Sequence, residues 1–202
     1  MGSVIPLKKE TENSYSRLKN LVGSRLDDVT QLIKYKLASE INLIHKMTEY
    51  HVKSGGKRIR PLLTLASAKL CGYKNGNRDI NLAACIELIH NATLLHDDVI
   101  DNSDLRRGIK TPNSVWGNQS SILVGDYLFS RCFEMMVEDG SQEILKLLSS
   151  TSSRIAQGEV LQLEYKGEID LLEETYFNII GMKTAAMFAA ATKVGACLGN
   201  KN

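Results

Sequence analysis

Apolar residues recur every three or four positions along most of the chain, which is the spacing of one face of an α-helix. No run alternates with the period of two that marks a strand, and no hairpin signal is present. The pattern therefore predicts an all-α protein. Its helices are expected at about residues 14–37 with a break at Gly23, and at 39–53, 61–71, 79–102, 120–138, 141–165 and 172–198.

The segment at 79–102 is apolar on nearly all sides, which is typical of a helix in the middle of a bundle. Three aspartates, Asp97, Asp98 and Asp101, stand near its end. Asp97 and Asp101 share a helix face, and Asp98 lies beside them. Carboxylates this close repel one another unless a hard cation such as Mg²⁺ binds through their oxygens. A solvated cap is the ordinary alternative, but these carboxylates continue an apolar helix, which favours a lined cavity.

Two basic segments accompany the aspartates. Arg106 and Arg107 follow them directly, and the sequence GGKRIRP at 55–61 combines glycines with cations ahead of a predicted helix start. His90 lies two turns before Asp97 on the same helix face. Arginines beside a carboxylate–metal cluster suggest a ligand that bridges both, and a diphosphate fits best. Taken alone, each segment could equally be a solvated basic loop, and His90 an ordinary core residue.

Composition argues against several other classes of protein. The 202 residues, with 43% hydrophobic and 24% charged, are ordinary for a globular protein, so we expect a flexible tail at 1–13 and one domain at 14–202. A net charge of +2, spread along the chain, argues against nucleic-acid binding. No apolar run approaches the ~20 residues of a membrane helix. The four cysteines lack paired spacing, so we expect buried thiols in a cytoplasmic protein and no zinc site.

Together the motifs resemble the trans (all-E) isoprenyl diphosphate synthases, also called the polyprenyl synthetase family. The matching segments are GGKRIRP at 55–61, HNATLLHDDVID at 90–101, RRG at 106–108, GD at 125–126, GEVLQLEY at 158–165 and MKT at 182–184. They span nearly the whole chain beyond the N-terminal tail. The resemblance implies an isoprenoid-synthase-type helical bundle of about ten or fewer helices, and a homodimer.

The resemblance also implies a Mg²⁺-dependent prenyltransferase that joins isopentenyl diphosphate to an allylic diphosphate such as farnesyl diphosphate. Catalytic roles would fall to Asp97, Asp98, Asp101, Arg106 and Lys183. Asp97 and Asp101 would hold the metal, with Asp98 either a ligand or a support for the others. The allylic diphosphate would be bound by Arg106, Lys183 and Thr184. Isopentenyl diphosphate would be bound by Lys57, Arg60, His90 and Arg107.

Product length in this family depends on the residues four and five positions before the first aspartate. Here they are Thr93 and Ala92, and Ala92 lies about one helical turn beyond the metal site. Their small size indicates a medium-to-long polyprenyl product, as in long-chain members such as the octaprenyl diphosphate synthases. The tunnel floor would come from the next helix, from Phe129, Phe133, Met135 or Met136. A close helix contact is the alternative explanation for Ala92.

Members of this family carry a second aspartate-rich motif, and no aspartate follows Thr184 here. We therefore expect a C-terminally truncated synthase whose final helix exposes an apolar face. A catalytically silent binding subunit is the alternative. A terpene cyclase is a weaker option, since cyclases need no isopentenyl diphosphate site of the GGKRIRP kind.

Overall fold

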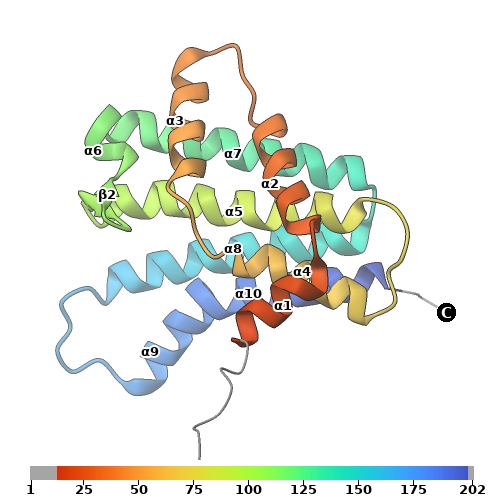
Figure 1. Ribbon diagram of the computed structural model, residues 1–202. Coiled ribbons are helices and arrows are strands. Elements are labelled where there is room, and N and C mark those ends of the chain that lie inside the picture. Colours follow the sequence, from red (N-terminus) through yellow and green to blue (C-terminus); the bar gives the residue numbers. More distant parts are fainter. Residues whose placement is uncertain (1–12, 200–202) are drawn as a thin grey trace, which may run out of the picture.

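The computed structural model describes residues 13–199, and these form a bundle of α-helices (Figure 1). The all-α prediction is confirmed, apart from a two-residue hairpin of strands β1 and β2 that the sequence did not predict. The tail expected at 1–13 lies outside the described residues except for Asn13. The elements are α1 Ser14–Val22, α2 Arg25–Lys36, α3 Asn42–Lys53, α4 Ile59–Leu70, α5 Arg78–Ile100, β1 Leu105–Arg106, β2 Ile109–Lys110, α6 Pro112–Trp116, α7 Asn118–Asp139, α8 Gln142–Glu164, α9 Glu173–Ile180, a π-helix Gly181–Ala185 and α10 Ala186–Leu198.

Helix α5 runs through the middle of the bundle and packs against α2, α4, α7 and α10 (Figure 1). Its side chains are buried almost all the way round, as the apolar pattern of this segment predicts. The β1–β2 hairpin and α6 follow the C-terminal end of α5, so the chain turns back immediately after the aspartates. This position places the three aspartates at one end of the protein core.

The last predicted helix is in fact two helices joined by the π-helix Gly181–Ala185. The expectation of an exposed apolar face is wrong for α10, because Met187, Val194 and Leu198 are buried against α4, α5 and α8. It holds for α9, where Tyr176 and Phe177 are exposed, and large exposed apolar side chains also lie on the second half of α8 and between α8 and α9, at Val160, Leu163, Ile169 and Leu172.

The starts of two helices differ from the predictions. Helix α4 begins at Ile59 because Arg58 adopts a left-handed conformation (φ 50°) as its N-cap, which makes Pro61 the third helical residue. Helix α3 begins at Asn42, and Ser39 instead accepts a hydrogen bond from the backbone N–H of Ile41. The local pattern therefore predicted most of the long helices, but it predicted their first turns less well, and it missed α6.

Two cysteines that are 47 residues apart in sequence meet in the core. The sulfur of Cys85 on α5 lies 2.8 Å from that of Cys132 on α7, and both are buried thiols. The prediction of buried cysteines is wrong for Cys71, which is exposed.

Within residues 13–199, no helix combines the length and the apolar character needed to cross a bilayer.

A buried histidine links α3 to α5. Nε2 of His51 lies 3.3 Å from Oδ1 of Asn91, and only 7% of the residue is exposed. Burial lowers the pKa of His51 from 6.5 to about 4. Between pH 6.5 and 4 the unfolded chain therefore binds a proton that the folded protein does not bind. The stability present above pH 6.5 is lost progressively as the pH falls through this range.

We expect His51→Gln to reduce this acid sensitivity. Between pH 7 and pH 5 the titration of His51 alone should lower the wild-type free energy of unfolding by about 2 kcal/mol. Glutamine does not titrate, and its amide can still bond to Asn91. Urea unfolding at both pH values measures the difference, and the other histidines are common to both proteins. An equal loss of stability in wild type and variant would contradict the assignment.

Candidate functional site

A cavity of about 600 Å³ opens where the 55–58 loop, α5, the hairpin turn and α10 meet. Four residues predicted to bind one diphosphate, Lys57, Arg60, His90 and Arg107, all line it. They come from three separate segments, which only the fold brings together. The remaining lining residues are Gly56, Arg58, Ile59, Glu87 and Phe188.

The cavity is strongly positive. Arg58 forms an ion pair with the buried carboxylate of Glu87, whereas Lys57, Arg60 and Arg107 form none within residues 13–199. The guanidinium carbon of Arg60 lies 4.5 Å from the ring centroid of Phe188. Its Nε atom is buried and has no hydrogen-bond partner among the described residues, and burial lowers the pKa of Arg60. Three cations with no paired carboxylate favour an anionic ligand.

His90 lies in the same cavity as a neutral imidazole. Burial, followed by the charges of Arg60 and Arg107, lowers the pKa of His90 from 6.5 to about 3. A neutral imidazole keeps one N–H donor, so His90 can donate a hydrogen bond to an anion without adding charge.

The backbone of this cavity is strained at two arginines. Arg58 and Arg107 have φ values of 50° and 55°, which are uncommon outside glycine. Arg107 and Gly108 form the two-residue turn of the hairpin, both with positive φ. A Cβ on Gly56 would lie 2.8 Å from Nη1 of Arg107, so only glycine lets this guanidinium approach the loop. Strain of this kind is concentrated at functional sites.

The three aspartates separate into two groups. Asp98 is fully buried, and Arg106 binds both of its carboxylate oxygens, with Nη2 2.7 Å from Oδ1 and Nε 3.1 Å from Oδ2. Its backbone carbonyl accepts hydrogen bonds from Ser103 and Asn113. Asp98 therefore anchors Arg106 and the segment that follows α5.

Asp97 faces a lysine–glutamate pair. Nζ of Lys183 in the π-helix donates a hydrogen bond to Oε2 of Glu159 on α8 at 2.7 Å. Burial, and then the negative charge of Glu159, raise the pKa of Asp97 from 3.8 to about 6. Asp101 is exposed at the end of α5. These four charged groups form a second polar region, distinct from the cation-rich cavity.

The protein side chains of this region would hold a metal ion together with the phosphate oxygens of a bound diphosphate. In the part of the chain that the structure describes, no three Asp, Glu, His or Cys side chains converge closely enough to hold one. Mg²⁺ often uses one or two carboxylates together with substrate phosphates and water. Asp97 and Asp101 fit that mode, whereas Arg106 already occupies the carboxylate of Asp98.

A glycine lets Lys183 reach its position. A Cβ on Gly158 would lie 2.8 Å from Cβ of Met182 and 2.9 Å from the backbone nitrogen of Lys183. Helix α8 therefore touches the π-helix directly, and π-helical turns are frequent at functional sites. Thr184 lies in the same turn and is exposed. Gly158 and Glu159 belong to the motif GEVLQLEY, but the sequence pattern alone predicted no role for either residue.

The predicted chain-length residues lie inside the bundle. Ala92 is fully buried, and the half-buried Thr93 donates its hydroxyl to the carbonyl of His90 at 2.8 Å. Of the floor candidates on α7, Met135 and Met136 are buried and Phe129 packs partly against the core. Phe133 is 47% exposed, so it does not close the interior.

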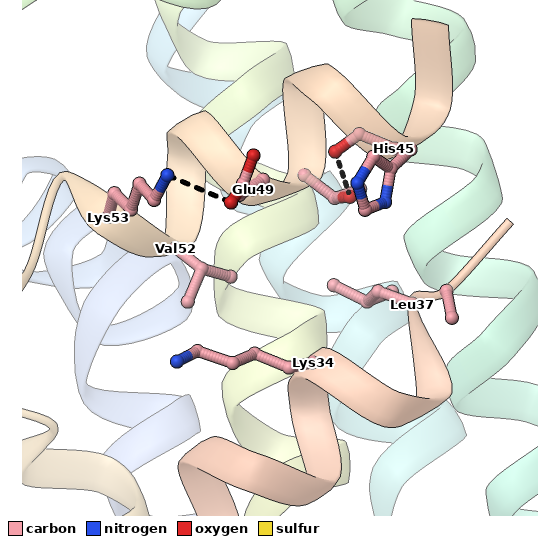
Figure 2. A pocket seen from close by; sticks show the side chains of 8 residues that line it. Lys34, Leu37, His45, Glu49, Val52 and Lys53 are labelled. Carbon is pink, nitrogen blue, oxygen red and sulfur yellow. Dashed lines mark hydrogen bonds and ion pairs between the residues drawn. The ribbon is translucent and has the colours of Figure 1, made fainter. Parts of the chain in front are cut away.

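A separate hollow of about 210 Å³ lies between α2 and α3 (Figure 2). Leu37 and Val52 line it, and the ammonium of Lys53 is paired with Glu49 (Figure 2). None of the predicted site residues contributes to it. The predicted site residues lie elsewhere, on the 55–58 loop, α4, α5, the hairpin and the π-helix.

The family model for polyprenyl synthetase matches residues 41–202. The chain belongs to the polyprenyl synthetase family. This membership confirms the resemblance inferred from the motifs. The family match covers most of the chain.

Relatives in this family are similar over nearly the whole chain. Octaprenyl diphosphate synthase of Escherichia coli (strain K12) is 43% identical over 182 residues, which cover 90% of this chain and 56% of the relative. The all-trans-nonaprenyl-diphosphate synthase (geranyl-diphosphate specific) of Rhodobacter capsulatus is 42% identical, with 85% and 53% covered. The chain thus spans just over half the length of these two polyprenyl synthetases.

A solved structure has the same fold. Polyprenyl synthase from Caulobacter crescentus CB15, complexed with calcium and isoprenyl diphosphate, superposes with a TM-score of 0.91 at 43% identity. The match covers 96% of this chain and 59% of that one. The isoprenoid-synthase-type helical fold predicted from the sequence is thereby confirmed.

Proposed function

We propose that the protein represented by this chain condenses isopentenyl diphosphate with an allylic diphosphate to make a medium-to-long all-E polyprenyl diphosphate. One observation carries the proposal. Within residues 13–199, Lys57, Arg60 and Arg107 have no paired carboxylate, and the cavity that they line is bounded by α5, the helix that also carries Asp97. His90 and Asp97 are separated by seven residues, or ~10 Å along the helix. Two diphosphates bound at these places would have neighbouring prenyl groups.

The residues divide between the two substrates. Lys57, Arg60 and Arg107 would neutralise isopentenyl diphosphate, and His90 would donate one hydrogen bond to it. Asp97 and Asp101 would hold Mg²⁺, which when bound offsets the charge that builds up on the departing diphosphate. Arg106, Lys183 and Thr184 would bind the same diphosphate. Asp98 would act through Arg106, because the carboxylate of Asp98 keeps that guanidinium in one orientation.

Glu159 gives Lys183 a fixed direction. The ion pair between them is largely buried, with 16% and 23% of the two side chains exposed. A lysine held in this way can meet an arriving diphosphate without first being ordered, which lowers the entropy cost of binding.

The assay supplies farnesyl diphosphate, labelled isopentenyl diphosphate and Mg²⁺, and looks for extended prenyl products. It is run on the 202-residue chain and on a chain extended to the length of the relatives. Products from either protein support the proposal. Activity restricted to the longer protein assigns the remaining catalytic groups to the added part. If neither protein forms an extended prenyl product, the proposal fails.

Product length is inferred from Ala92 and supported by the octaprenyl and nonaprenyl names of the two relatives. We expect Ala92→Phe to shorten the product, because a phenyl ring would fill space beside the growing chain. Ala92→Ser is the size-matched control and should leave product length unchanged. Chromatography of the dephosphorylated products measures the result. A destabilised variant with unaltered products would show instead that Ala92 is a close helix contact.

The homodimer and the cytoplasmic location remain predictions. Helix α7 carries exposed apolar side chains at Leu123, Phe133 and Val137, which are 61%, 47% and 68% exposed. Such a stripe is compatible with a helix-to-helix dimer contact.

A further inference from the structure

The loop that carries Lys57 is held from outside the family-matched region. The hydroxyl of Tyr15 on α1 donates a hydrogen bond to the backbone carbonyl of Lys57 at 2.9 Å. The family match begins at residue 41, so Tyr15 precedes it. The N-terminal helix therefore reaches directly into the wall of the cation-rich cavity.

The carbonyl of Lys57 has no other donor within residues 13–199. In a continuing helix it would accept from the residue four positions later, which is Pro61 and has no N–H. The loop is also costly to order, because Gly55 and Gly56 lose much conformational freedom and Arg58 has a positive φ value. Tyr15 thus supplies the hydrogen bond that the local sequence cannot.

The second cation-bearing loop has the same kind of support. The hydroxyl of Tyr50 on α3 donates to the backbone carbonyl of Lys110 at 2.8 Å, in the hairpin whose turn contains Arg107. The Tyr50 ring packs edge-on against Trp116, with centroids 5.1 Å apart. Each of the two loops is therefore held through a carbonyl by a tyrosine from a different N-terminal helix.

We propose that Tyr15 is a positioning residue for isopentenyl diphosphate, which orders the 55–58 loop so that Lys57 faces the cavity beside Arg60 and Arg107. This inference rests on the proposed function. Tyr15 does not contact the ligand. It keeps the Lys57 backbone in its bound conformation before the ligand arrives, which reduces the ordering cost of binding.

The test compares Tyr15→Phe with the control Tyr35→Phe in the 202-residue chain. Tyr35 is 75% exposed, so losing its hydroxyl should change nothing. Phenylalanine at residue 15 keeps the ring that packs on the core and removes only the donor. We expect faster amide hydrogen exchange at residues 55–58, and about fivefold weaker binding of isopentenyl diphosphate by calorimetry. Binding of farnesyl diphosphate with Mg²⁺ should be unchanged.

The outcomes separate this inference from the proposed function. If wild type binds isopentenyl diphosphate and Tyr15→Phe binds it equally well, the role of Tyr15 is overturned and the proposed function still stands. If both diphosphates weaken together with a drop in melting temperature, Tyr15 is merely structural and the inference is also overturned. If isopentenyl diphosphate is bound neither by the wild-type 202-residue chain nor by the extended protein, the proposed function is overturned, and the inference falls with it.

Discussion

Replacing Asp98 with asparagine is expected to lower the free energy of unfolding by about 3 kcal/mol. The carboxylate is fully buried and both its oxygens accept hydrogen bonds from Arg106. Asparagine has nearly the same shape, but its amide nitrogen would face guanidinium donors and its neutral charge would leave Arg106 unpaired. The hydrogen bonds from Ser103 and Asn113 reach the backbone carbonyl of residue 98, so the variant keeps them and the expected loss comes from the Arg106 pair.

Asp101→Asn is the matched control. Asp101 is exposed at the C-terminal end of α5, where a negative charge is unfavourable to the helix dipole. The free energy of unfolding of the Asp101→Asn protein should stay within about 0.5 kcal/mol of the wild-type value. Its Mg²⁺-dependent binding of farnesyl diphosphate should fall at least about tenfold, the usual cost of losing a metal-site group.

Urea unfolding and calorimetric binding distinguish the two variants. A stable Asp98→Asn protein with a specific loss of metal-dependent binding would make Asp98 a metal ligand. An Asp101→Asn protein that binds farnesyl diphosphate normally would remove Asp101 from the metal site.

Replacing Gly195 with alanine is expected to lower the free energy of unfolding by about 2 to 3 kcal/mol. The new Cβ would lie 2.3 Å from the carbonyl oxygen of Thr64 and 2.8 Å from the backbone nitrogen of Ala68. Backbone atoms of α4 cannot rotate away, so α10 would have to separate from α4 along one of the largest interfaces of the bundle. Phe188, which stacks on Arg60, lies on the same helix.

Gly181→Ala tests whether any added methyl has this effect. A Cβ there meets nothing within 4 Å, so the change should be neutral or slightly stabilising through helix propensity. Chemical denaturation of both variants gives the comparison. Equal stabilities would mean that α4 and α10 adjust without cost, contrary to the close packing of their backbones.

Much of the fold could be predicted because its determinants are local. The apolar character of α5 on all sides placed it in the centre, and Gly23 and Gly140 marked breaks with positive φ. The π-helix was missed because its residues follow the ordinary helical pattern, and only the tertiary structure shows that this turn packs against Gly158 of α8. The hairpin was missed because two-residue strands are too short to show alternation.

The sequence by itself determined the family, the helical class and the identity of the charged groups, since motif spacing and helical period are properties of the chain. The tertiary structure alone decided what each group faces. It paired Asp98 with Arg106, Lys183 with Glu159, and the Lys57 carbonyl with Tyr15. These partners are 8, 24 and 42 residues apart. No periodicity relates them, because the contacts depend on how helices pack and where loops turn.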